Sequence, residues 1–219
     1  MTDKILIGCE LSGVAREAFR MLGHDAWSCD VEPSDDDSPH HIQGDLLAQL
    51  REPNQWDLLI AHPPCTYITC SAEWAYKDEP REGYHQKVKP GTLTGHARRL
   101  ARNDAVEFFM KIANAPIDRI VIENPVGVMS SRWRKADQYI HPYQFGDDAS
   151  KRTGLWLKNV KPLTIDPSIR VDGRIVNGVE RWANQTDSGQ NRLGPSSKRA
   201  KVRSKTYKGI ALSMAEQWG

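Results

Sequence analysis

The chain has 219 residues, of which 39% are hydrophobic and 26% are charged, and its formal net charge is +2 at pH 7. These values exclude an intrinsically disordered protein and indicate one well-buried α/β domain with a small appendage. Apolar runs reach only about six residues, so we expect no membrane span, no signal peptide and a cytoplasmic location.

The four cysteines, at positions 9, 29, 65 and 70, lack the paired spacing of zinc fingers. We therefore expect reduced thiols. His40 and His41 are adjacent, but no third ligand follows at a useful spacing, so we predict no metal site.

The first predicted unit is a strand, a glycine-bounded turn and a helix. Residues 4–8 form the strand, residues 8–13 the turn, and the helix follows with Ser12 as its N-terminal cap. This unit opens many nucleotide-binding and S-adenosylmethionine-binding domains, because glycine lets a ligand approach the backbone closely. Many such turns also bind nothing.

Two acidic residues follow the next predicted strand, residues 26–29. Asp30 stands at the tip of that strand, roughly twenty positions past the glycine turn, where an acid suits recognition of ribose hydroxyls. Asp45 precedes an apolar segment, residues 46–50, and is expected either to cap it as a short helix or to bind a ligand.

Cys65 follows a third predicted strand, residues 56–61. Pro63 and Pro64 end that strand, because proline lacks an N–H group and restricts the residue before it. The thiol is thus presented beyond the carboxyl end of a strand, where ligands and catalytic groups collect in α/β sheets. The alternative is a small buried hydrophobic residue.

Residues 71–95 form a long loop, of a length typical of functional or mobile segments, and its Trp74, Tyr76, Tyr84 and His85 either stack on bases or pack a lid. A helix over residues 96–114 and a strand over residues 119–127 follow.

Glu123 lies near the end of this later strand, so a thiol and a carboxylate reach the same edge of one sheet. That pair suits attack on an electron-poor ring, with thiolate as nucleophile and Glu as proton donor to a ring nitrogen. The carboxyl must then hold a proton near neutral pH, so we expect a raised pKa in a partly buried site.

Pro64-Cys65 and Glu123-Asn124, in this order, resemble the two catalytic motifs of the DNA (cytosine-5)-methyltransferase family, within it the short phage and prophage forms. The resemblance covers roughly the first 160 residues and the extreme C-terminus. Pro125 departs from the valine that the larger enzymes usually carry.

The resemblance implies an α/β, Rossmann-like class I S-adenosylmethionine-dependent methyltransferase fold, with a mixed, mostly parallel sheet flanked by helices. It implies a catalytic domain at 1–161 with the active-site loop at 71–95, a small recognition or basic region at 162–202, and a segment at 203–219 that returns to the catalytic domain.

The resemblance also implies how the site works. Cys65 would add to C6 of a flipped cytosine, Glu123 would act at N3, and C5 would take a methyl group from the cofactor S-adenosyl-L-methionine. Asn124 would fix the strand end. The residues implied to bind the cofactor are Gly8, Cys9, Glu10, Leu11, Ser12, Asp30, Val31, Asp45, Leu46, Pro63, Thr206, Tyr207 and Gly209.

Residues 140–145 and 155–157 are predicted to be two strands, paired as an antiparallel hairpin. In the family, the loop between them carries two arginines one residue apart, one of which holds the substrate base. Arg152 is the nearest match, and a surface charge is the alternative.

The implied partner is DNA, double- or single-stranded, and a cluster of cations late in the chain supports a phosphate-binding surface. Readout by the small region 162–202 is expected to be limited, through Arg170, Arg174, Arg181, Trp182 and the basic run. The basic residues predicted to bind nucleic acid are Arg192, Lys198, Arg199, Lys201 and Arg203.

Three alternatives remain from the sequence. One is the same chemistry on RNA or a free nucleotide, which the short recognition region favours. Another is a nucleic-acid-binding relative without catalysis. A third is methylation of an exocyclic amine, but such enzymes need an aromatic residue directly after the prolines, where this chain has Cys65.

Overall fold

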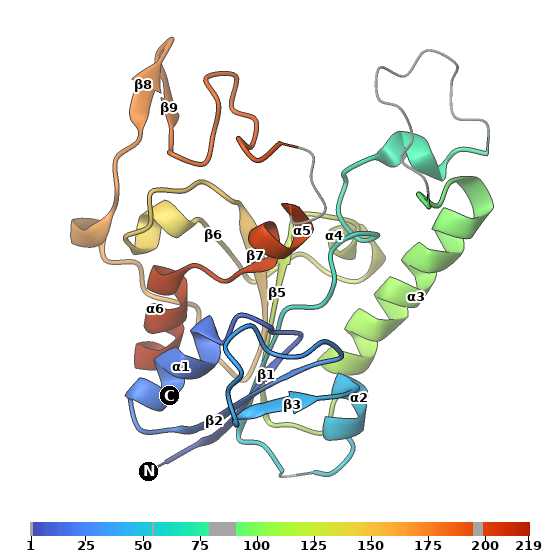
Figure 1. Cartoon of the computed structure of the whole chain (residues 1–219), viewed down its shortest axis with the longest axis vertical. Coiled ribbons are helices and arrows are strands. Elements are labelled where there is room, and N and C mark those ends of the chain that lie inside the picture. The colour runs from blue at the N-terminus through green and yellow to red at the C-terminus, as the bar shows by residue number, and fades with distance from the viewer. Residues whose placement is uncertain (1, 54, 79–90, 195–198) are drawn as a thin grey trace.

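The computed structural model describes residues 2–53, 55–78, 91–194 and 199–219 (Figure 1). Its main feature is a seven-stranded sheet in the order β3-β2-β1-β4-β5-β7-β6. The strands are β1 Lys4–Gly8, β2 Asp25–Asp30, β3 His41–Gln43, β4 Leu58–Ala61, β5 Arg119–Pro125, β6 Gln138–Ile140 and β7 Thr153–Lys158.

Strands β1 to β5 pair in parallel, and only β7 runs antiparallel to both of its neighbours, β5 and β6. The predicted fold class, a Rossmann-like methyltransferase fold with a mixed and mostly parallel sheet, is confirmed. Parallel strands are covered on both faces, which explains why β1 and β4 are continuous apolar runs.

Successive side chains of the central strands enter two separate cores. Ile5 and Ile7 of β1 pack in the core beneath α1 and α6, whereas Leu6 packs in the opposite core with α2 and α3. The helices that cover the sheet are α1 Val14–Met21, α2 Leu46–Gln49, α3 Gly95–Ala113 and α6 Lys208–Trp218. Figure 1 shows α1 and α6 side by side on their face of the sheet.

The remaining elements are short and follow the carboxyl ends of the parallel strands or extend from β7. They are η1 Glu73–Tyr76, α4 Met129–Arg132, η2 Pro142–Phe145, η3 Pro167–Ile169, the two-stranded hairpin of β8 Arg174–Val176 and β9 Val179–Arg181, and α5 Arg199–Ser204. No helix in the described ranges is both long enough and apolar enough to cross a membrane.

Two local predictions were wrong in detail. The strand expected over residues 140–145 ends at Ile140, and η2 follows because Pro142 has no N–H for a ladder. Its antiparallel pairing with β7 is confirmed. Gly13, not Ser12, is at the cap position of α1, although the Ser12 hydroxyl accepts the N–H of Val14 at 3.4 Å; a buried carboxylate, described below, takes the N–H groups of Ala15 and Arg16.

Candidate active site

The site lies where three neighbouring strands, β1, β4 and β5, end at the same edge of the sheet. β4 stops at Ala61, and the chain continues through His62, the two prolines and Cys65. The carbonyl oxygen of Cys65 accepts hydrogen bonds from the N–H groups of Ile68 and Thr69, at 3.2 and 3.1 Å. The prolines and this turn fix the backbone that carries the thiol.

The loop that carries Cys65 is bonded to the end of β5. Asn124 is buried, and its Nδ2 donates to the carbonyl oxygen of Pro63 at 2.7 Å. Farther along, the N–H of Val128 donates to the carbonyl of Ile68 at 2.8 Å. The loop that carries the predicted thiol is therefore bonded to the end of the strand that carries the predicted carboxylate.

Glu123 has a cation or a ring nitrogen near each carboxylate oxygen. Nδ1 of His62 is 3.2 Å from Oε2, and Nζ of Lys151 is 3.9 Å from Oε1. Burial alone would raise the pKa of Glu123, but Lys151 and His62 outweigh it and lower the pKa to about 2. The prediction of a raised pKa was therefore wrong, because sequence did not reveal these two neighbours. The carboxylate is ionised at neutral pH.

Lys151 and Glu123 also act on the pKa of the Cys65 thiol. On balance that pKa is raised: burial raises it, Lys151 lowers it in part, and Glu123 raises it. Lys151 therefore favours the thiolate, the reactive form of cysteine, against the combined effect of burial and a neighbouring carboxylate. All four cysteines are free.

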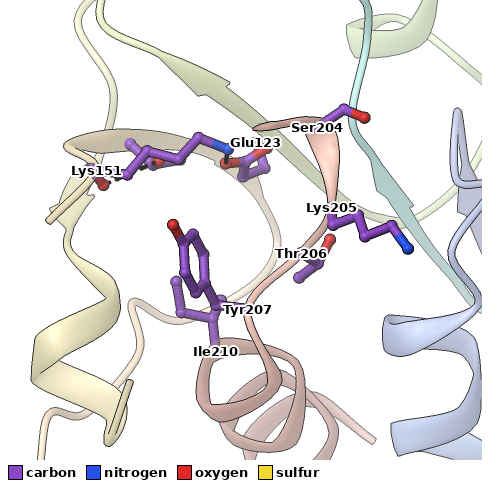
Figure 2. Close-up of a pocket in the computed structure, with 8 residues that line it drawn as sticks. Glu123, Lys151, Ser204, Lys205, Thr206, Tyr207 and Ile210 are labelled. Atoms are coloured by element: carbon purple, nitrogen blue, oxygen red, sulfur yellow. Dashed lines mark hydrogen bonds and ion pairs between the residues drawn. The ribbon is translucent and has the colours of Figure 1, made fainter. Parts of the chain in front are cut away.

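A small pocket beside Glu123 is completed by the C-terminal part of the chain. Figure 2 shows the Tyr207 hydroxyl pointing toward Glu123 and Lys151, whereas the Lys205 side chain points away from them. Lys205 instead pairs with Asp35 at 3.3 Å. The lining residues are Glu123, Lys151, Thr153, Ser204, Lys205, Thr206, Tyr207 and Ile210.

Arg152, the residue singled out from the sequence, points elsewhere. Its guanidinium lies over the ring of Tyr139, 4.4 Å from the ring centroid, and the residue is exposed. Lys151 is the cation at Glu123 and also donates to the carbonyl of Arg203 at 3.3 Å. Lys151 and His62 are the functional residues that sequence reasoning missed. The available signals were that His62 adjoins the two prolines before Cys65 and that Lys151 is the neighbour of Arg152.

Two carboxylates lie near the glycine turn that follows β1: Asp30 ends β2, and Asp45 comes shortly after β3. Cys9 has a left-handed φ of 57°, and its N–H donates to the carbonyl of Cys29 at 2.7 Å. Burial raises the pKa of the Cys9 thiol, and Asp30, Cys29 and Asp45 raise it further. Asp30 and Asp45 therefore lie near one another around this turn. Carboxylates accept hydrogen bonds from hydroxyl and amino groups. This pair of acceptors therefore fits the ribose hydroxyls and amino group of a nucleoside.

Glu10, in the same turn, is buried and bound to α1. Its Oε1 accepts the N–H of Ala15 at 2.7 Å and its Oε2 accepts the N–H of Arg16 at 3.2 Å. These are N–H groups of the first helical turn, which otherwise lack partners. Burial raises the pKa of Glu10, while His62 and the two backbone bonds lower it.

Several other residues predicted to bind the cofactor pack or form hydrogen bonds within the fold, and one of them is exposed. Leu46 is buried against Gly8, where an added Cβ would lie 2.6 Å from a Leu46 methyl. Asp45 caps α2 by accepting the N–H of Leu47 at 3.0 Å, as predicted. Val31 is 69% exposed, and Leu11 is half-buried and accepts the N–H of Asp35 through its carbonyl.

Gly209 is the point where α6 meets η2. An added Cβ would lie 1.7 Å from the carbonyl oxygen of Phe145, and the Gly209 N–H donates to Asp147 at 2.9 Å. Close packing thus accounts for this glycine, and it fixes the approach of Thr206 and Tyr207 to the pocket.

The recognition region uses several of its predicted readout residues internally. Arg170 pairs with Asp172 and Glu180, and Arg174 pairs with Asp187 at 2.8 Å. Trp182 is buried and stacks on Tyr143 with ring centroids 4.1 Å apart. Arg181 donates to the carbonyls of Asp187 and Glu180.

The basic run is described only in part. Arg192 donates to the carbonyl of Gln185 at 2.8 Å, and the Arg203 side chain is exposed. Lys198 and the side chains of Arg199 and Lys201 lie outside the described residues, as do Tyr84 and His85 of the 71–95 loop. In that loop, Tyr76 is buried and donates its hydroxyl to the carbonyl of Tyr67 at 2.9 Å, so it packs.

No protein-family model matches this sequence, and no curated protein matches it. Among solved structures, the chain is similar to a candidate DNA modification methyltransferase encoded within a prophage, from E. coli, at 14% identity and a TM-score of 0.41. The match covers 75% of this chain and 49% of the other, so the chain spans about half the length of that protein. A likeness this distant leaves the activity to be inferred from the chain's own residues.

Proposed function

We propose that this protein transfers a methyl group from S-adenosylmethionine to C5 of cytosine in DNA, through a covalent bond between Cys65 and C6. The observation that carries the proposal is the shared site of Cys65 and Glu123. Their loops are joined by the Asn124–Pro63 hydrogen bond, and the Lys151 cation acts on both groups.

The nucleophile is the Cys65 thiolate. C5 of cytosine is too electron-poor to take a methyl group unaided, and addition of a thiolate at C6 makes C5 electron-rich. The cation of Lys151 stabilises the thiolate before the addition. It also balances the negative charge that then spreads over the ring.

Glu123 acts on the edge of the ring that carries N3 and the exocyclic amine. An ionised carboxylate accepts a hydrogen bond from that amine, which is how acidic side chains recognise cytosine. N3 needs a proton as the thiolate adds, and because the carboxylate is ionised, Glu123 would have to receive a proton from a neighbouring group before it passes one to N3. Once C5 carries the methyl group, loss of its hydrogen restores the ring and expels the thiolate.

The cofactor would lie over the glycine turn. Asp30 would accept from the ribose hydroxyls and Asp45 from the adenine amine, with Cys9 between them. Thr206 and Tyr207 would approach from the C-terminal segment. When bound, S-adenosylmethionine supplies an electrophilic methyl group on a positively charged sulfur. The substrate base must be unstacked to reach Cys65, at a cost of a few kcal/mol.

Methyl incorporation into unmethylated genomic DNA tests this proposal. The labelled nucleosides are separated, so that 5-methylcytosine is distinguished from methylation on exocyclic amines. Competition by RNA and by dCMP defines the substrate class. DNA that contains 5-fluorocytosine should trap a covalent adduct at Cys65, because fluorine cannot leave C5 as a proton does.

Cys65→Ser and Glu123→Gln should lose activity, whereas Cys70→Ser, which changes the other exposed thiol of this loop, should keep it. Full activity in Cys65→Ser or Glu123→Gln would remove that residue from the mechanism. Labelled N4-methylcytosine or N6-methyladenine in place of 5-methylcytosine would overturn the proposed chemistry.

A further inference from the structure

We infer that His62 supplies the proton that Glu123 delivers to N3 of the cytosine. This inference rests on the proposed function and adds a positioning residue to it. His62 acts through Glu123 and has no contact with the substrate of its own.

The position of His62 in the fold is well defined. It follows β4, the strand between β1 and β5, and its backbone N–H donates to the carbonyl of Gly8 at 2.9 Å. Its side chain is only 7% exposed, and Nδ1 lies 3.2 Å from Oε2 of Glu123. An ionised carboxylate only accepts hydrogen bonds, so Nδ1 carries the proton of this pair.

The other ring nitrogen, Nε2, is buried and has no hydrogen-bond partner among the described residues. Glu10, at the tip of β1, interacts electrostatically with His62. His62 therefore interacts with an acidic side chain from each of the two neighbouring strands. Only the imidazolium form carries a proton on both nitrogens.

Glu123 needs such a partner because it has no proton of its own to give. Its pKa is lowered to about 2 by surroundings that include Lys151 and His62, despite its burial. Lys151 is a poorer source, since its Nζ is 3.9 Å from the carboxylate and donates to the Arg203 carbonyl. The described side chains that hydrogen-bond Glu123 are His62 and Thr153, and of these the imidazole is the proton source, because a threonine hydroxyl is a far weaker acid.

The proton transfer balances without any further reactant. A sulfur lone pair forms the bond to C6, the C5=C6 pair moves to C4–C5, and the C4=N3 pair moves onto N3. Glu123 takes the Nδ1 proton and passes that proton on to N3, so the imidazolium becomes neutral imidazole and the carboxylate ends as it began. When the thiolate leaves, the N3 proton returns by the same route.

This relay predicts a pH profile with an alkaline limb that belongs to His62. The groups that face His62 are Glu123 and Glu10, and Lys151 and Cys65 act from the far side of Glu123. Loss of the imidazolium proton at high pH removes the source, while protonation of Cys65 at low pH removes the nucleophile. The rate should therefore be bell-shaped.

His62→Asn is the informative variant, because its amide N–H can still donate to Glu123 but cannot carry a transferable proton. The readout needs no cofactor: DNA with tritium on C5 of cytosine releases it to water when Cys65 adds reversibly to C6. We expect release to slow about 100-fold, the lower end of general acid–base effects, with the alkaline limb lost.

A second substrate separates proton supply from positioning. In 5-azacytosine the extra ring nitrogen makes C6 more electron-poor and takes up negative charge. We therefore expect the covalent adduct of His62→Asn with 5-azacytosine DNA to form within about 10-fold of the wild-type rate. His40→Asn is the matched control, since His40 also has a buried nitrogen without a described partner, and it should behave as wild type.

Each outcome decides the question. An unchanged rate and alkaline limb in His62→Asn would overturn the inference, and so would equal losses on cytosine and 5-azacytosine, which indicate a purely structural role. His62→Gln, with its melting temperature compared to wild type, replaces the Asn variant if that fails to fold. If the wild-type protein neither releases tritium nor methylates C5, the proposed function fails and the inference with it.

Discussion

Asn124 donates from Nδ2 to the carbonyl oxygen of Pro63 at 2.7 Å, and this buried bond joins the end of β5 to the turn that presents Cys65. The two residues are 61 positions apart in the chain. This bond therefore holds the turn that carries Cys65 against the strand that carries Glu123.

Asn124→Ala should weaken both the fold and the site. A buried carbonyl left without its donor costs about 1–3 kcal/mol, and the freed turn should slow adduct formation at Cys65. Urea unfolding and the rate of trapping by 5-fluorocytosine DNA measure the two effects. Asn114→Ala removes a bond of the same kind, Nδ2 to the Met110 carbonyl at 2.8 Å, at an exposed helix end and should change little. Equal effects in both variants would contradict this account.

Lys151→Met should make Cys65 less reactive. The lysine cation lowers the pKa of the thiol, so its removal should shift the alkylation of Cys65 by iodoacetamide to higher pH. Peptide mass spectrometry follows each cysteine separately, and exposed Cys70 serves as the internal control. Arg152→Met is the control, because the Arg152 guanidinium lies over Tyr139, and it should leave the pH dependence of Cys65 alkylation unchanged. A shift in Arg152→Met but not in Lys151→Met would mean that Arg152 is the cation that acts on Cys65.

Glu123 should make the protein sensitive to acid. Its pKa falls from an ordinary 4.5 to about 2 on folding, so it stabilises the native state above about pH 4.5 and this contribution is lost as the pH falls toward 2. The contribution is on the order of 3 kcal/mol. Urea unfolding between pH 6 and pH 2 should show a flatter dependence for Glu123→Gln than for wild type.

The control for acid sensitivity is Glu107→Gln. Glu107 pairs with Lys111 at 2.8 Å on the exposed face of α3, and solvent screens such pairs. Its free energy of unfolding should depend on pH as that of the wild-type protein does. If Glu123→Gln also showed the wild-type pH dependence, Glu123 would not be held ionised by its neighbours.

Gly209→Ala should destabilise the fold by about 3 kcal/mol. The added methyl would lie 1.7 Å from the backbone carbonyl of Phe145, which cannot rotate away, so α6 must shift. Thermal or urea unfolding measures the loss. Gly194→Ala, where no described atom lies within 4 Å of the added atom, should stay within about 0.5 kcal/mol of wild type. Similar stabilities of the two variants would rule out the close contact.

Much of the sheet could be predicted from sequence because its strands are buried on both faces. The run Lys4–Gly8 was predicted with the bounds that β1 has, and the prolines after Ala61 marked the end of β4. Those two signals were enough to bring Cys65 and Glu123 to one edge of the sheet, since carboxyl ends of parallel strands meet there.

The neighbours that set the chemistry could not be predicted in this way. Lys151 and Arg152 are adjacent cations in one loop, and only the path of the backbone into β7 decides which faces Glu123. His62 contacts a carboxylate 61 positions away, and the Glu10 side chain accepts the N–H groups of Ala15 and Arg16 in α1. Such contacts depend on side-chain geometry in three dimensions, which residue patterns do not encode.

The hydrogen bonds that Glu10 makes to α1 have a consequence for ligand binding at the glycine turn after β1. In dinucleotide-binding relatives of the fold, the amino end of the first helix attracts a pyrophosphate, because unpaired N–H groups and the helix dipole favour an anion. In this protein the Glu10 carboxyl group already accepts the N–H groups of Ala15 and Arg16. These two donors are therefore taken before any ligand arrives, and a phosphate at this helix end would have to compete with a buried side chain for them.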